Sequence, residues 1–497
     1  MPSYSSDDIM ADWRYAVEQD FTTSAGEPYP YANNGKLQWG NELNKITFKN
    51  QPQPQPQLGC VSHDGSRLAF AVDRNIHIVD TQTWETLTVL KGHTSGINAL
   101  AFRPNDARTL ISCEKPMYDR HRLGKEPTII LWNIEEEQEK ISLVDDQLSS
   151  ISQAAASVVG DKLAELGVYL DHAKIQNLAA VFEPAVDRLV AEHIAAGKPT
   201  VQGKLIFSHE SQIFSPSGQY IAYIPGKPPR SNRDDPWDIT ILSVDEFKEV
   251  ITLKGHTDAM MWLGWNSDES LFASVSWDGT IRIWDPKTGD QKHLFRTDHQ
   301  NWTGGFSPDS KYFATVDGDA NVRIYSIVSG GKLHWTYDGQ RTDYWRRTIS
   351  WHPNSQWLAV GGEKSGELLL LDIEEKKVLQ KRLLSADAST SKDEVQDMMK
   401  GFVGTYKVKF VDGGNKLAVW TFGDDSIEVY DINQQVKWRF ARGGTEDGPE
   451  ADKWRDDEGK VTSQRGYSML TWENHTKGVL QLASLDFDGA RIWEIQL

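Results

Sequence analysis

The sequence lacks the features on which several classes of protein depend. It has only two cysteines, Cys60 and Cys113, which are too few for a disulfide framework or a thiolate zinc site. No apolar run approaches the roughly 18 residues that span a bilayer. The first twenty residues show no basic segment followed by an apolar one, so we expect no secretory signal. These absences predict an intracellular protein, cytoplasmic or nuclear, that is not secreted and does not enter a membrane.

Basic charge and recognisable catalytic motifs are also scarce. The net charge is −18 over 497 residues, which argues against direct binding of nucleic acid, because phosphate neutralisation needs clustered Lys and Arg. The motifs GxxxxGK[ST], GxGxxG, HExxH and GxSxG do not occur. The 13 histidines do not cluster with carboxylates at metal-ligand spacing. We therefore expect no enzyme activity, no metal and no cofactor.

What the sequence does contain is a repeated strand pattern. Residues 274–285, SVSWDGTIRIWD, alternate polar and apolar residues on both sides of an Asp-Gly turn, which predicts a β-hairpin. The same frame, an apolar strand, a Ser-Pro-Asp-like turn and a later strand ending in an aromatic residue or Asp, recurs along the chain. It begins near residues 61, 101, 213, 305, 350, 409 and 470, which with the first example makes eight units. Repetition at this spacing is typical of radial β-sheet architectures.

This repetition resembles the WD40 family. The resemblance is carried by Gly255-His256, Asp278-Gly279 and Trp284-Asp285, and in part by Gly92-His93 with Trp132. It implies an all-β propeller over residues 36–497, with eight blades or alternatively seven. The last unit is one strand short, so we expect the strand-like residues 44–48 near the N-terminus to complete it, which would leave no free sheet edge.

The resemblance also assigns a structural network to certain polar residues. In the family a blade is held by a hydrogen-bonded His, Ser or Thr, Asp and Trp, and this sequence supplies the set once, as His256, Ser274, Asp278 and Trp284. The second unit keeps His93, Ser112 and Trp132, but an insertion displaces its turn aspartate. A buried indole N–H and a buried imidazole need polar partners, so we assign these residues to stability and not to catalysis.

Two segments depart from the repeat. Residues 1–35 are polar and rich in turn residues, and we expect a flexible arm in which Trp13, Tyr15 and Phe21 are possible anchors. Residues 140–198 carry apolar residues at helical spacing around Pro184, where we expect a break. They predict a helical insertion in the second blade, packed on the propeller or alternatively free to bind a partner.

Aromatic and arginine residues in loops are the best candidates for an interface. Trp277 lies in the hairpin turn, where nothing in the fold requires an indole, and other candidates open the following units. Two inserted loops in adjacent units add basic residues. The complete predicted interface consists of Met260, Trp277, Trp302, Tyr344, Trp345, Arg346, Arg347, Arg120, Arg122, Arg230 and Arg233.

These observations favour a non-catalytic scaffold that binds protein or peptide partners on the top face of the propeller, and we expect a monomer. Three alternatives remain open. The acidic balance suits an escort chaperone for a basic client protein. Residues 283–287 approach the WDxR box of ubiquitin-ligase substrate receptors, but Lys287 stands where arginine is expected and cannot form its bidentate fork. A propeller channel can also assemble an active site from distant residues.

Overall fold

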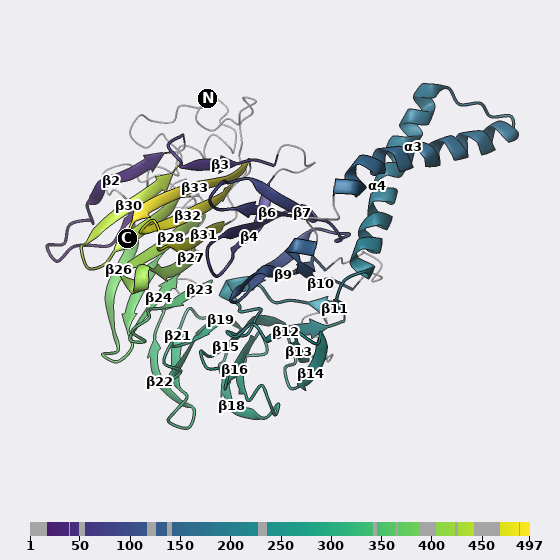
Figure 1. Ribbon diagram of the computed structural model, residues 1–497. Coiled ribbons are helices and arrows are strands. Elements are labelled where there is room, and N and C mark those ends of the chain that lie inside the picture. The colour runs from purple at the N-terminus through teal and green to yellow at the C-terminus, as the bar shows by residue number, and fades with distance from the viewer. Residues whose placement is uncertain are drawn as a thin grey trace, which may run out of the picture. The chain divides into compact units, whose positions relative to one another are not determined.

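The computed structural model describes most of the chain. The described residues are 17–38, 40–48, 55–116, 126–136, 142–226, 236–340, 345–363, 366–386, 404–422, 426–441, 468–486 and 488–497. Among them strands predominate, and two long helices lie within residues 142–196 (Figure 1). The chain divides into two compact units. The smaller unit is Gln57–Lys204, and the larger unit is Met1–Pro56 together with Leu205–Leu497.

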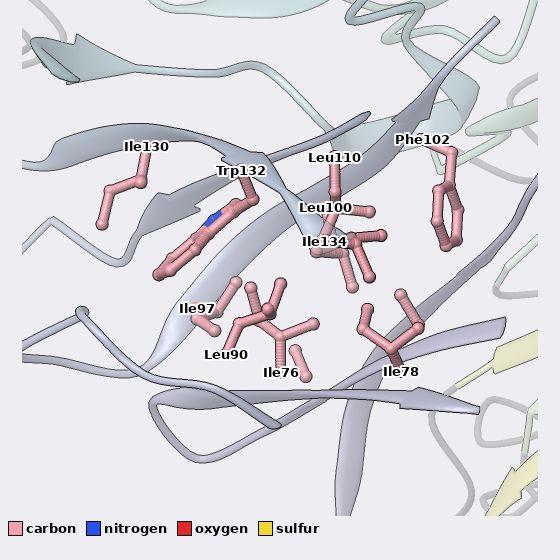
Figure 2. Packing of buried hydrophobic residues seen from close by; sticks show 12 residues of the cluster. Ile76, Ile78, Leu90, Ile97, Leu100, Phe102, Leu110, Ile130, Trp132 and Ile134 are labelled. Atoms are coloured by element: carbon pink, nitrogen blue, oxygen red, sulfur yellow. The ribbon is translucent and has the colours of Figure 1, made fainter. Parts of the chain in front are cut away.

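Two antiparallel sheets form the smaller unit. The first follows the order β4 (Pro56–Val61), β5 (Arg67–Val72), β6 (Asn75–Asp80) and β7 (Thr86–Leu90), and the second contains β8 (Ile97–Arg103), β9 (Asp106–Glu114), β10 (Thr128–Asn133) and β11 (Thr200–Lys204). Their apolar faces meet in one core, in which Ile76, Ile78 and Leu90 oppose Leu100, Leu110 and Trp132 (Figure 2). The alternating apolar residues of each strand are thereby removed from water, which is the main stabilising contribution.

The helical insertion lies between β10 and β11, which pair directly through Ile130 and Thr200. It consists of α3 (Ser142–Glu165) and α4 (His172–Ala196), where the helical spacing of the sequence predicted helices. Asp171 begins α4 by accepting a hydrogen bond from the backbone N–H of Lys174 at 2.9 Å. The expected break at Pro184 is wrong, because α4 continues through this residue.

Antiparallel sheets of consecutive strands make up the larger unit. They comprise β12 (Tyr220–Pro225), β13 (Ile239–Ser243) and β14 (Lys248–Leu253); β15 (Met260–Trp265), β16 (Phe272–Ser276), β17 (Thr280–Trp284) and β18 (Gln291–Arg296); β19 (Asn301–Phe306), β20 (Tyr312–Asp317), β21 (Val322–Ser326) and β22 (Lys332–Tyr337); β23 (Thr348–Trp351), β24 (Trp357–Gly361), β25 (Leu368–Asp372) and β26 (Lys377–Ala386); β27 (Gly404–Val411), β28 (Lys416–Phe422), β29 (Ile427–Asp431) and β30 (Val436–Ala441); and β31 (Ser468–Asn474), β32 (Val479–Asp486) and β33 (Gly489–Gln496).

The hairpin predicted from residues 274–285 is present as β16 and β17. Val275 pairs with Ile281, so the chain reverses over the five residues between them. Gly279 has a φ of 76°, which favours glycine because it has no Cβ. A Cβ at this position would also lie 3.1 Å from the carbonyl oxygen of Thr297. The Asp-Gly dipeptide is thus explained by the backbone of the turn.

Three N-terminal strands add to sheets formed much later in the sequence. β3 (Asn44–Ile46) pairs antiparallel with β33, with Lys45 opposite Arg491, as expected for a completing strand. The expectation that residues 1–35 form a flexible arm is wrong for part of this segment. β1 (Val17–Asp20) pairs with β26, and β2 (Tyr31–Gln38) pairs in parallel with β30. Trp13 and Tyr15 lie outside the described residues.

Side chains also join neighbouring sheets of the larger unit at their first strands. Thr348 and Ser350 of β23 accept hydrogen bonds at 3.0 and 3.1 Å from the backbone N–H groups of Val408 and Phe410 in β27. Glu473 of β31 accepts one from Asp412, directly after β27, at 2.7 Å. Donors at the edge of β27 are satisfied in this way without a further strand. The all-β class and the sheet-by-sheet order agree with a propeller, whereas the blade number and the closure of the ring stay predictions.

Candidate functional site

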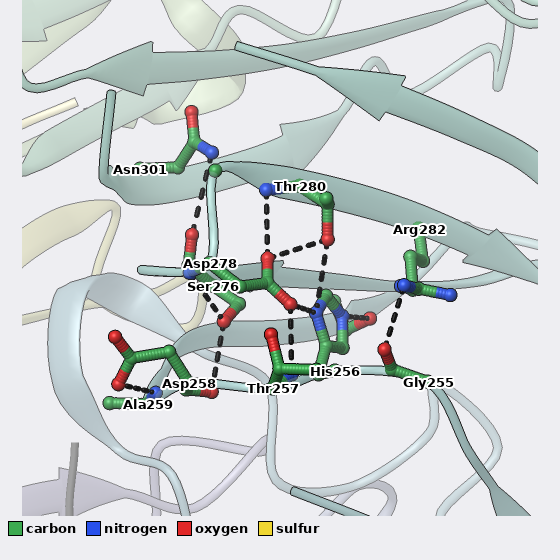
Figure 3. A network of polar contacts seen from close by, with 12 residues as sticks. Gly255, His256, Thr257, Asp258, Ala259, Ser276, Asp278, Thr280, Arg282 and Asn301 are labelled. Atoms are coloured by element: carbon green, nitrogen blue, oxygen red, sulfur yellow. Dashed lines mark hydrogen bonds and ion pairs between the residues drawn. The ribbon is translucent and has the colours of Figure 1, made fainter. Parts of the chain in front are cut away.

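Four side chains of the repeat signature form a continuous hydrogen-bond chain in the sheet β15–β18. The indole N–H of Trp284 donates to the Ser274 hydroxyl at 2.9 Å, and that hydroxyl lies 2.7 Å from Nε2 of His256. Nδ1 of His256 lies 2.7 Å from Asp278 Oδ2 (Figure 3). Asp278 also accepts from the hydroxyl of Thr280 at 2.6 Å and from the backbone of Thr257 at 3.1 Å. Every polar atom along this chain is therefore used.

The directions of these bonds identify the protonation state of His256. A carboxylate can only accept, so Nδ1 carries the proton that it donates to Asp278, and Nε2 accepts from Ser274. Burial lowers the pKa of His256, although the hydrogen bond with Asp278 opposes this shift. Burial raises the pKa of Asp278, but the hydrogen bonds from His256, Thr280 and Thr257 together outweigh it and the pKa falls to about 2. The network thus contains a neutral imidazole and an ionised carboxylate, which suits a structural role.

The smaller unit contains a second network with a different acid. Ser112 lies 2.6 Å from Nε2 of His93 and accepts the indole N–H of Trp132 at 2.7 Å. Glu114 takes the place of the missing aspartate, since it accepts from the backbone N–H of Thr94 at 2.6 Å and from that of Thr128 at 3.2 Å. Glu114 was not predicted from the sequence, because the WD40 pattern places the acid in the turn, whereas Glu114 is the last residue of β9.

Four of the predicted interface residues come together in the larger unit, in what we call the aromatic–arginine cluster: Trp277, Trp302, Trp345 and Arg347. The rings of Trp277 and Trp302 meet edge to face with centroids 5.5 Å apart, and those of Trp302 and Trp345 are 6.3 Å apart. The guanidinium of Arg347 lies 4.4 Å from the Trp302 ring and 4.1 Å from the Trp345 ring. These residues belong to the turn after β16, to β19 and to the segment before β23, so three successive sheets contribute.

The cluster has an exposed side and a buried side. Trp345 is 36% exposed and Trp277 is partly exposed, whereas Trp302 is buried beneath them. Glu363 lies 3.4 Å from the Arg347 guanidinium and orients it from the side. The indole N–H groups of Trp277 and Trp302 find no acceptor among the described residues. The cluster therefore combines apolar ring surface with an oriented cation on its exposed side.

Two other predicted interface residues are buried and contradict the expectation that they lie at the surface. Arg346 is fully buried and pairs with Glu367, which in turn pairs with Lys381. Adjacent residues of an extended segment point to opposite sides, so Arg347 enters the cluster and Arg346 enters the interior. Met260 is 3% exposed and belongs to the apolar core of its sheet. The remaining predicted interface residues, Tyr344, Arg120, Arg122, Arg230 and Arg233, lie outside the described residues.

The described residues contain no group of three or more His, Cys, Asp or Glu side chains that could hold a metal ion. Among the described helices, none has the length and apolar composition needed to cross a membrane.

Comparison with known proteins defines the class to which this fold corresponds. The family model for the WD domain, G-beta repeat (WD40), matches residues 84–121 and 247–285, which contain part of the network around His93 and all of the network around His256. The resemblance to the WD40 family is therefore confirmed at these two repeats.

A solved structure extends the likeness to most of the chain. The chain is similar to Saccharomyces cerevisiae Sqt1, known from its crystal structure, with a TM-score of 0.58 and 10% sequence identity. The match covers 91% of this chain and 99% of that one. At this identity the likeness concerns the fold alone. No curated protein matches the sequence significantly.

Proposed function

We propose that this protein is a non-catalytic scaffold that binds a protein or peptide partner through the aromatic–arginine cluster. The observation that carries the proposal is the convergence of Trp277, Trp302, Trp345 and Arg347 from three sheets onto one partly exposed surface. Tryptophan and arginine are the residue types most enriched among those that dominate binding energy at protein interfaces. WD40 proteins in general use such surfaces to bind other proteins.

The geometry supports peptide binding because the cluster is largely pre-organised. The guanidinium of Arg347 is held by two rings and by Glu363, so little side-chain entropy is lost when a partner docks. The exposed part of Trp345 and the partly exposed ring of Trp277 offer flat apolar surface on which side chains of a peptide can pack.

Affinity purification with mass spectrometry tests the proposal. We would compare the wild-type chain with Trp345→Ala and with Arg347→Lys, which keeps the charge beside Glu363 but loses the planar group stacked on the rings. Leu333→Ala is the matched control, since Leu333 is an exposed apolar residue of β22 outside the cluster. Both cluster variants should lose the same partner proteins, and the control should keep them. Retention of every partner by correctly folded cluster variants would reject the proposal.

A further inference from the structure

Exposed apolar side chains are concentrated in the helical insertion. Among the described residues, 16 large apolar side chains are exposed, and half of them belong to α3, α4 or the turn between them. These are Ile151, Val158, Val159, Leu166, Val168, Tyr169, Val181 and Leu189. Large exposed apolar patches on soluble proteins mark interaction sites. Figure 1 shows both helices extending away from the sheets of the smaller unit.

The contact between α3 and α4 includes small residues of α3. α3 presents small residues to α4 at every fourth position, namely Ser152, Ala156 and Gly160, and all three are buried. Gly160 faces Ile175 of α4, because a Cβ on Gly160 would lie 3.5 Å from its Cδ1. Small residues let two helices approach closely, so α3 packs on α4 through this side while Ile151, Val158 and Val159 stay exposed.

The larger side chains instead share one face of the hairpin. On α3 the stripe is Ile151, Ala155 and Val159, each one residue before a buried position, and on α4 it is Val181, Ala185 and Leu189, each one residue before a half-buried position. At about 100° per residue, each stripe is therefore displaced in the same rotational sense from the less exposed side of its helix. Because the two helices face each other and run antiparallel, equal senses of displacement place both stripes on the same side. We call this the apolar face of the hairpin.

Charge indicates what kind of partner this face suits. From Ser142 to Ala196 the sequence has eight Asp and Glu residues but only three Lys and Arg residues, a net charge of −5 (three minus eight). Each of the three cations already pairs with an acid of the hairpin, through Lys162 with Glu165, Lys174 with Asp171, and Arg188 with Glu192. A fourth acid, Asp187, pairs with Arg74 outside the hairpin. The charge that remains is still acidic, which favours a partner carrying Lys or Arg.

We propose that the apolar face binds an amphipathic helix of another protein, apolar on one side and flanked by Lys and Arg, which completes a three-helix bundle. The stripe of α4 from Val181 to Leu189 extends about 12 Å, which corresponds to two turns at the centre of the docked helix. Val181 is 70% exposed and Leu189 is 64% exposed, so a third helix would remove substantial apolar area from water. This site is separate from the aromatic–arginine cluster.

Binding of synthetic peptides to the full chain tests the proposal. The probe is a fluorescent peptide of about 18 residues with leucines at helical spacing and lysines elsewhere. Two companions isolate its properties: one with Glu in place of Lys, and one of the same composition with the leucine spacing scrambled. We expect anisotropy titration to detect binding of the Leu/Lys helix alone.

Exposed apolar residues provide a matched set of variants. Val159→Gln and Leu189→Gln remove apolar area from the proposed face and should each weaken peptide binding by about tenfold, or about 1.4 kcal/mol. Leu333→Gln is the control, because Leu333 is an exposed apolar residue of β22 outside the hairpin. It should bind within about twofold of wild type, a difference well below one tenfold step. Trp345→Ala should also bind the peptide normally, which separates this site from the proposed function above.

Several results would overturn the proposal. Equal binding of the scrambled peptide would mean general attraction of a basic chain to an acidic protein. Equal binding of the Leu/Glu peptide would reject the basic partner. If no peptide binds and sedimentation shows a dimer that Leu189→Gln dissociates, a second copy of this chain covers the face instead.

Discussion

At the scale of single residues, a neutral imidazole links an indole to an ionised carboxylate in the sheet β15–β18. His256 can donate to Asp278 and accept from Ser274 only in one tautomer, so each partner fixes the orientation of the ring. Removing one partner leaves a buried polar atom without a hydrogen bond, and that loss costs more than the bond itself contributed.

Asp278→Asn is therefore expected to lower the free energy of unfolding by about 1–3 kcal/mol. The amide cannot accept from His256, Thr257 and Thr280 with the strength of the carboxylate. Urea denaturation would measure the change. Asp298→Asn is the control, because Asp298 is an exposed aspartate that makes no hydrogen bond or ion pair with the described residues, and it should leave the midpoint unchanged. Equal stability of the two variants would contradict the structural role of the network.

Adjacent arginines are expected to differ in the same experiment. Arg346→Ala should lower the free energy of unfolding by about 3 kcal/mol, because it removes a buried charge from Glu367. Arg347→Lys should cost about 1 kcal/mol or less, since the ammonium still faces Glu363 and only the stacking on the rings is lost. If Arg347→Lys proves the more destabilising of the two, the assignment of Arg346 to the interior and Arg347 to the cluster is wrong.

These residues also show which contacts the sequence could predict. The set around His256 was predictable because its members keep fixed positions in a repeated frame. Glu114 was not, because a longer side chain at the end of β9 performs the role of a turn aspartate. Which of Arg346 and Arg347 is buried depends on which side of the segment faces the interior. A shift of one residue along the segment would exchange the two side chains, and the sequence does not indicate that shift.

At the scale of elements, the insertion was the easiest part to predict and the N-terminal strands were the hardest. Apolar residues at helical spacing over 140–198 identified α3 and α4 because amphipathic helices carry their pattern within the sequence. β1 and β2 carry no alternating pattern, and their strand conformation comes from the edges of β26 and β30 to which they bind. The residue patterns of β1 and β2 do not indicate with which distant strand each of them pairs.

The segment that links β1 and β2 is held by an aromatic anchor, which gives a prediction at this scale. Phe21 is fully buried and meets the ring of Tyr430 edge to face at 4.9 Å. Phe21→Ala should lower the free energy of unfolding by about 3–4 kcal/mol through lost apolar contact and a cavity. Limited proteolysis should then cut the chain within residues 17–38 first.

Leu43→Ala is the matched control for Phe21→Ala, since Leu43 is an N-terminal apolar residue that is 48% exposed. It should change neither the stability nor the pattern of cleavage. If Phe21→Ala behaves in the same way as this control, the N-terminal strands contribute nothing to the larger unit.

At the scale of the whole molecule, buried and partly buried histidines in both units couple stability to pH. Burial lowers the pKa of His256, His293 and His352 in the larger unit. In the smaller unit burial, aided by the charge of Lys91, lowers the pKa of His77 to about 4. A group whose pKa is lower in the folded state contributes stability above its unfolded pKa and loses it as the pH falls. Asp20 opposes this trend, because burial raises its pKa to about 6 despite its ion pair with Lys437.

The contribution of His77 can be separated from the others by substitution. With a pKa of about 4 when folded and 6.5 when unfolded, acidification from pH 7.5 to pH 5 should cost about 2 kcal/mol at this residue. Urea unfolding of the wild type and of His77→Gln at both pH values would measure the difference. The variant should be less sensitive to acid by about that amount, because glutamine does not titrate.

Asp278 and Asp488, whose pKa values are about 2, contribute nothing in this range because they lose their charge only in stronger acid. Equal acid sensitivity of wild type and variant would mean that His77 accepts its proton as readily in the folded state as in the unfolded one.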